Sequence, residues 1–73
     1  MVQAITIVPS ADGWSVKSET FNSEMFFSSG AKAEAAARRL ASRIARAGEP
    51  VEIEIYLRDG ALGGRSDFTP EVF

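Results

Sequence analysis

Two glutamates late in the chain have the spacing of an acid/base pair. Glu52 and Glu54 are separated by one residue within the segment 51–57. In an extended chain their side chains would lie on the same side, about 7 Å apart, a separation that acid/base pairs in glycosidases also show. However, the sequence offers no accompanying nucleophile, and alternating glutamates also keep an exposed strand face solvated, with Lys17 or Arg58 as cross-strand partners. We therefore expect a charged strand face, and we expect the protein not to be an enzyme.

The sequence contains neither histidine nor cysteine among its 73 residues. This composition excludes disulfides, thiolate chemistry, histidine-based triads and the cysteine-based zinc motifs. Asp12-Gly13 and Asp59-Gly60 are typical turn dipeptides, and Gly63-Gly64 lacks the lysine and the strand-to-helix turn of a phosphate-binding loop. We expect no metal site and no cofactor.

Basic side chains recur at helical spacing in the segment 31–47. Lys32, Arg39, Arg43 and Arg46 would fall within about 60° of each other on a helix surface. This segment carries five basic residues and one acidic residue, a net charge of +4, whereas the rest of the chain carries three basic and nine acidic residues, a net charge of −6. The stripe could contact a phosphate backbone or an acidic partner, or it could be a solvated helix face. The overall net charge of −2 disfavours nucleic acid and anionic membranes as partners.

Large apolar side chains offer a third candidate site. Phe26 and Phe27 are adjacent, so in a strand they must point to opposite sides, and one of them lacks a core to enter. Tyr56 would lie on the sheet face that a single helix leaves uncovered. Such an apolar spot could be an ordinary exposed residue or the centre of a dimer or partner interface.

Four strands and one helix must position these residues. The β-branched segment 4–8 and the alternating segments 14–18 and 51–57 predict strands, and the segment 21–27 permits another. Helix-forming residues fill 31–47, with Ser29 as the N-cap and Gly48 as the C-terminal stop. The expected buried stripe of this helix consists of Ala33, Ala36, Ala37, Leu40, Ile44 and Ala47.

These elements predict a single α+β domain over residues 1–73. One helix would pack on a three- to four-stranded, mostly antiparallel sheet, as a two-layer ββ(β)αβ sandwich. A strand order of 3-2-1-4 would place the last strand parallel to the first. The glycines and polar residues of 63–73 are typical of a loop or a frayed end, which Phe68 and Phe73 could hold down.

Four short motifs resemble a known family. Val8-Pro9 precedes Asp12-Gly13-Trp14-Ser15-Val16-Lys17, and Lys32-Ala33-Glu34-Ala35 and Arg58-Asp59-Gly60 follow. This order is similar to the pattern V-P, G-W-x-V-K, T-K-x-E-A and R-D-G of the bacterial domain of unknown function family 2188. Gly30-Ala31 stands where that pattern has a threonine before the lysine. The resemblance implies the fold and a bacterial origin, and it implies no activity or site residue.

The functional expectation is a small non-enzymatic module. We expect it to bind another protein, or a second copy of itself, through the open sheet face or an edge strand. Weak nucleic-acid binding through the arginines of the helix is the alternative. The early apolar run 4–8 is too short for a signal or membrane segment, so we expect a cytoplasmic location and no membrane contact.

Overall fold

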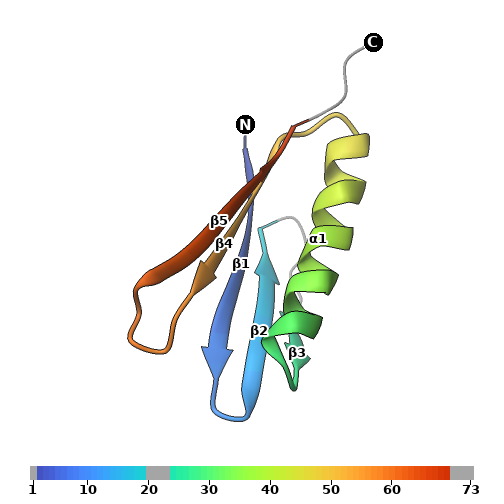
Figure 1. Ribbon diagram of the computed structural model, residues 1–73. Helices are drawn as coiled ribbons and strands as arrows, with labels where there is room; N and C mark the ends of the chain where they lie inside the picture. The colour runs from blue at the N-terminus through green and yellow to red at the C-terminus, as the bar shows by residue number, and fades with distance from the viewer. Residues whose placement is uncertain (1, 20–23, 70–73) are drawn as a thin grey trace.

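A computed structural model describes residues 2–19 and 24–69 of the chain. Its architecture is α+β, with one helix packed on one face of a five-stranded mixed sheet (Figure 1). The elements, in chain order, are β1 (Gln3–Ser10), β2 (Gly13–Ser18), β3 (Glu24–Phe27), α1 (Gly30–Arg46), β4 (Val51–Tyr56) and β5 (Leu62–Phe68).

The strand order in the sheet is β3-β2-β1-β4-β5, so β1 is the central strand. β1 pairs in parallel with β4, and the other three neighbouring pairs are antiparallel. The expected order of the first four strands, with the last of them parallel to the first, is therefore confirmed. The sheet has one strand more than the sequence predicted.

The additional strand corrects the expectation of a loop or a frayed end for residues 63–68, whereas residues 70–73 lie outside the described part of the chain. Residues 62–68 pair along the whole of β4, from Tyr56↔Leu62 to Val51↔Phe68. A turn starts the hairpin: the Leu57 amide donates to the Ala61 carbonyl over 2.8 Å, and the Ala61 amide donates to Asp59 Oδ1 over 2.9 Å. The free edge of β4 thus supplies a hydrogen-bond ladder that outweighs the low strand propensity of the two glycines. Phe68 packs against the core, whereas Phe73 lies outside the described residues.

Strand β3 confirms the described part of the predicted segment 21–27. It covers Glu24–Phe27, and residues 20–23 lie outside the described part of the chain. A close approach fixes its contact with β2, because a Cβ atom at Gly13 would overlap the Phe27 carbonyl oxygen. Only glycine fits at that position.

Helix α1 begins at the predicted cap. Ser29 Oγ accepts a hydrogen bond from the Lys32 amide at 3.2 Å, which satisfies one of the amides that a helix start leaves unpaired. At the other end, Gly48 has a φ of +98°, the left-handed conformation that stops a helix. The predicted N-cap and C-terminal stop are both confirmed.

The core lies between α1 and the facing side of the sheet. The expected stripe of the helix was partly wrong: Ala41 is buried and was missed, Ala36 and Leu40 are only half-buried, and Ala47 is exposed. Ala47 is exposed because it caps the end of the helix, beyond the last turn that packs on the sheet. The buried hydrophobic residues of this core are Ile5, Ile7, Val16, Val51 and Ile53 from the sheet and Ala33, Ala37, Ala41 and Ile44 from the helix.

Candidate functional site

The six residues predicted to bind a partner separate onto two surfaces. Phe26 and Tyr56 lie on the sheet face opposite α1, which we call the open face. Arg39, Arg43 and Arg46 gather beside β3 on the other side of the sheet. Lys32 shares the helix with them but does not line the same groove.

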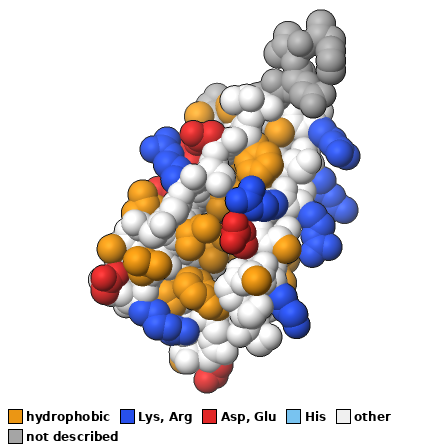
Figure 2. Space-filling model, in the orientation of Figure 1, with side chains coloured by type: hydrophobic (Ala, Val, Ile, Leu, Met, Phe, Trp, Pro, Cys, Tyr) orange, Lys and Arg blue, Asp and Glu red, His pale blue; other side chains and the backbone are white. Residues whose placement is uncertain are grey.

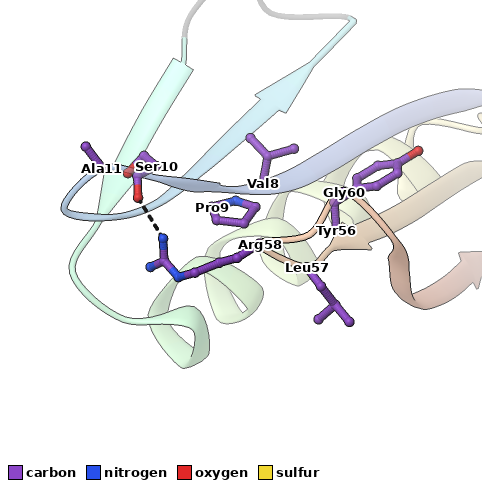
Figure 3. A pocket seen from close by; sticks show the side chains of 8 residues that line it. All are labelled: Val8, Pro9, Ser10, Ala11, Tyr56, Leu57, Arg58 and Gly60. Carbon is purple, nitrogen blue, oxygen red and sulfur yellow. Dashed lines mark hydrogen bonds between the residues drawn. The ribbon is translucent and has the colours of Figure 1, made fainter.

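The open face carries an apolar row near the hairpin ends of the strands. Phe26 is paired with Ser15 and is 68% exposed, while its neighbour Phe27 packs against the core on the other side, as the alternation predicts. Val8 is paired with Ser15, and Figure 3 shows its side chain pointing to the same side as that of Tyr56. Leu62 on β5 extends the row beyond Tyr56 and is half exposed. Ser15, between Phe26 and Val8, is itself buried at 1% exposure. We call the apolar members of this set the apolar row: Phe26, Val8, Tyr56 and Leu62.

The next row of the open face is charged. Thr6 of the central strand is paired with Lys17 on one side and with Glu54 on the other. Lys17 is in turn paired with Glu24, and Glu54 with Arg65. The charged row therefore reads, from one sheet edge to the other, Glu24, Lys17, Thr6, Glu54 and Arg65.

Ion pairs on the open face involve different partners from those expected. Glu52 pairs with Arg65 at 2.9 Å, and not with Lys17 or Arg58. Lys17 lies on β2, which β1 separates from β4, and it pairs with Glu24 at 3.6 Å. The true partner of Glu52 was missed because it belongs to β5, the strand that the sequence did not predict.

Tyr56 is held against the carboxylates of its own strand. Its hydroxyl donates to Glu54 Oε2 at 3.2 Å. The negative charge of Glu54 raises the pKa of the Tyr56 hydroxyl above 10.0, and desolvation, the hydrogen bond to Glu54 and the charge of Glu52 add to the effect. Tyr56 is therefore a neutral hydrogen-bond donor at neutral pH, and it keeps Glu54 in a fixed orientation.

A shallow hollow lies where β1 and β4 part at the hairpin ends. The parallel pairing stops at Ile7↔Ile55, and Pro9 has no amide hydrogen to continue it. Arg58 bridges the opening: its Nη1 donates to the Ser10 carbonyl at 3.1 Å, and its guanidinium lies 5.7 Å from the centre of the Trp14 ring. The hollow measures about 630 Å³ and is open to solvent (Figure 3). The sequence suggested Arg58 only as a cross-strand partner of the glutamates, because the bridge to Ser10 and Trp14 depends on where the two hairpins meet.

The predicted basic stripe borders a groove between α1 and β3. Met25 and Phe27 from β3 and Ala36 and Leu40 from the helix form its apolar floor, and Arg39, Arg43 and Arg46 stand along it. The groove measures about 610 Å³. Figure 2 shows Lys and Arg side chains following the flank of the molecule on which α1 lies. The sequence predicted the arginines as a set, whereas Met25 and Phe27 join them only through the position of β3 at the sheet edge.

Residues 2–19 and 24–69 show no candidate metal site and no membrane-spanning helix. Within these residues, no group of three or more His, Cys, Asp or Glu side chains is placed to hold a metal ion. None of the helical residues described forms a segment long and apolar enough to cross a membrane.

Searches for similar proteins leave the family of the chain open. The chain matches no protein-family model, no curated protein and no solved structure. The resemblance to the bacterial family 2188 stays a prediction, and the functional argument rests on the two surfaces alone.

Proposed function

We propose that this chain is a protein-interaction module without catalytic activity, and that the partner on its open face is a second copy of the same chain. The observation that carries the proposal is the order of charges in the charged row. From β3 to β5 the row is negative, positive, neutral, negative, positive, with Thr6 of the central strand in the middle. When a second copy of the row faces the first in reversed order, each negative charge therefore meets a positive one.

A two-fold axis that runs along β1 between two facing sheets produces this reversal. The rotation places Lys17 over Glu54 of the second copy and Glu24 over its Arg65, and each contact occurs twice in the dimer. Thr6 meets Thr6. The strands of the two sheets remain nearly aligned, which is one of the two common ways in which sheets pack.

The alternative axis, across the strands within the same plane, gives the opposite result. It would place Lys17 on Lys17 and Glu54 on Glu54, so that like charges meet at each charged position of the row. The charge order therefore favours one orientation and opposes the other, which is how an interface acquires specificity.

The apolar row supports the same arrangement. The rotation about β1 brings Phe26 over Leu62 of the second copy and Val8 over Val8. These are among the apolar side chains that the fold leaves uncovered, since Phe26 is 68% exposed and Leu62 50% exposed. Burying them in pairs provides the non-polar centre that a dimer interface needs.

The size of the open face limits the strength of the dimer. Five strands spaced about 4.8 Å apart and about 20 Å long present roughly 480 Å² per copy, or close to 1,000 Å² in total. This total is near the lower bound for specific interfaces. The row beyond, which includes Glu19 and Glu52, would bring carboxylates together and adds no attraction. We expect a dimer that dissociates on dilution in the micromolar range.

Charge reversal and charge exchange test the proposal by light scattering and sedimentation velocity. The unmodified chain should approach twice its 7.9 kDa mass at high concentration. Lys17→Glu removes two attractive contacts, each worth about 1 kcal/mol, and replaces them by repulsive ones, so it should weaken the dimer at least about 30-fold. The double exchange Lys17→Glu with Glu54→Lys should restore it. Within one copy these residues are two strand spacings apart, about 10 Å, so restoration reports a contact between copies.

Lys32→Glu serves as the matched control, because it makes the same charge change on the helix, away from the open face. It should leave the dimer unchanged. A chain that stays at 7.9 kDa at millimolar concentration would refute the proposal, as would a double exchange that fails to restore what the single reversal lost.

A further inference from the structure

We propose that the groove between α1 and β3 binds an acidic peptide in extended conformation, which adds to the sheet as a strand along the free edge of β3. The site lies on the helix side of the sheet and does not depend on the dimer proposed for the open face. Three observations support it: the unpaired strand edge, the apolar floor, and arginines without acidic neighbours.

The edge of β3 is open to a further strand. β3 stands at the end of the sheet order and pairs with β2 on one side only. Within the described residues, no other backbone group hydrogen-bonds to Glu24–Phe27 from the opposite side. The amides and carbonyls of alternate residues on that side are therefore available, and a peptide strand satisfies such groups in β-strand addition.

Apolar side chains line the groove beside this edge. Met25 and Phe27 point to the helix side of β3, and Met25 is 39% exposed despite its position next to the core. Leu40, one of the two large apolar side chains of the helix, is also only half-buried there. Because side chains of a strand alternate, every second side chain of an added peptide would reach this floor.

The arginines along the groove have no ion-pair partner in the described part of the chain. Arg38, their neighbour, pairs with Glu34 at 2.9 Å, but Arg39, Arg43 and Arg46 form no such pair. The helix dipole accounts for cations in the last turn, where Arg43 and Arg46 stand. It does not account for Arg39, which lies about one turn before Arg43, so the set is better explained by an acidic ligand.

Spacing identifies the kind of peptide that fits. Arg39 and Arg43 are four residues apart, a rise of about 6 Å along the helix. Side chains on one face of a strand are spaced about 6.6 Å. A peptide with acidic residues at positions i and i+2 thus matches the two arginines, and a further apolar residue on the same face would meet Met25 and Phe27.

A peptide fits this groove better than a nucleic acid does. The chain has a net charge of −2, which disfavours binding of a polyphosphate backbone. The free hydrogen-bonding edge is also complementary to a peptide backbone. Nucleic-acid binding through the same arginines becomes one outcome of the test.

The test uses fluorescence anisotropy with an end-blocked octapeptide that has glutamate at positions 2 and 4, valine at positions 6 and 8 and threonine at the odd positions, so that the acidic and apolar side chains share one face. The unmodified chain should bind it, and the same peptide with lysine in place of both glutamates should bind at least ten-fold more weakly. The double variant Arg39→Gln with Arg43→Gln should weaken binding of the acidic peptide about ten-fold or more. Arg38→Gln is the matched control on the same helix and should retain full affinity.

Three further measurements decide the binding mode. Methylating alternate amides of the acidic peptide on its pairing edge should weaken binding about ten-fold, and the NMR amide signals of Glu24–Phe27 should shift on titration with the unmethylated peptide. Circular dichroism verifies that each variant is folded. No binding of the acidic peptide, equal loss with Arg38→Gln, or no effect of methylation would overturn the proposal. So would a single-stranded dodecanucleotide that displaces the peptide and binds more tightly.

The two proposals can fail independently. Arg39→Gln with Arg43→Gln should leave the dimer mass unchanged, because both arginines lie on the helix side of the sheet. Lys17→Glu should leave peptide binding unchanged, because Lys17 points to the open face. If either variant abolished both dimerisation and peptide binding, the two surfaces would not be separate.

Discussion

Replacing Gly13 by alanine should destabilise the fold by about 2 kcal/mol. A Cβ atom at this position would overlap the Phe27 carbonyl oxygen, and its other close neighbours, the Phe27 carbonyl carbon and Ser28 Cα, would lie 3.2 Å away. All three are backbone atoms, so no side-chain rotation relieves the overlap, and β2 must separate from β3 by roughly 1 Å. Overpacking of this kind costs about 1 to 3 kcal/mol.

This loss is large for a domain of 73 residues. A core of this size rarely supplies more than about 5 kcal/mol, so the variant should lose close to half of the stability. At about 4 to 8 °C per kcal/mol, the midpoint of thermal unfolding should fall by roughly 8 to 16 °C.

Urea unfolding followed by far-UV circular dichroism and by the fluorescence of Trp14 measures the effect. Trp14 is the single tryptophan and is paired with Phe27, so its emission reports the strand contact directly. Gly64→Ala is the control: its Cβ would lie 3.6 Å from Ile55 Cδ1, an ordinary contact, and its unfolding free energy should change by less than about 0.5 kcal/mol. Equal stability of Gly13→Ala and the unmodified chain would refute the close approach of β2 and β3.

Two further predictions concern the helix start and the open face. Ser29→Ala removes the acceptor of the Lys32 amide and should lower the unfolding free energy by about 1 kcal/mol, whereas Ser28→Ala, outside that hydrogen bond, should have little effect in the same urea titration. Glu54→Gln should lower the pKa of Tyr56 towards its ordinary value of 10.0, as measured by the ultraviolet absorbance of the single tyrosine during an alkaline titration. Because the folded-state pKa of Tyr56 is raised, the contribution of Tyr56 to stability is fully present below pH 10 and is lost as the pH rises through the folded-state pKa. An unchanged pKa of Tyr56 in Glu54→Gln would contradict Glu54 as the cause of the raised pKa.

The elements with strong local patterns were predictable from the sequence. The helix, its Ser29 cap and its glycine stop follow from helix propensity and capping, and β1, β2 and β4 follow from apolar alternation. β5 could not be predicted because its residues favour a turn in isolation. Its stability depends on the edge of β4, a partner that no local pattern reveals.

The candidate surfaces were predictable only as separate parts. Helical periodicity grouped Arg39, Arg43 and Arg46, and alternation predicted that Phe26 or Phe27 would face outwards. The charged row required the register, because Lys17 and Glu54 share a row only through Thr6 of the strand between them. Tertiary pairing, and not sequence spacing, created both the charge order and the groove.

The central position of β1 has a consequence for how the chain folds. β1 meets β2 through a short hairpin, but its parallel contact with β4 joins Gln3 to Val51, which are far apart in the sequence. Forming that contact requires a long loop to close, which is slow compared with the local β1-β2-β3 meander. We expect the meander and α1 to form early and the β4-β5 hairpin to dock in the rate-limiting step. During synthesis, β1 would therefore present an unpaired edge until the last two strands emerge.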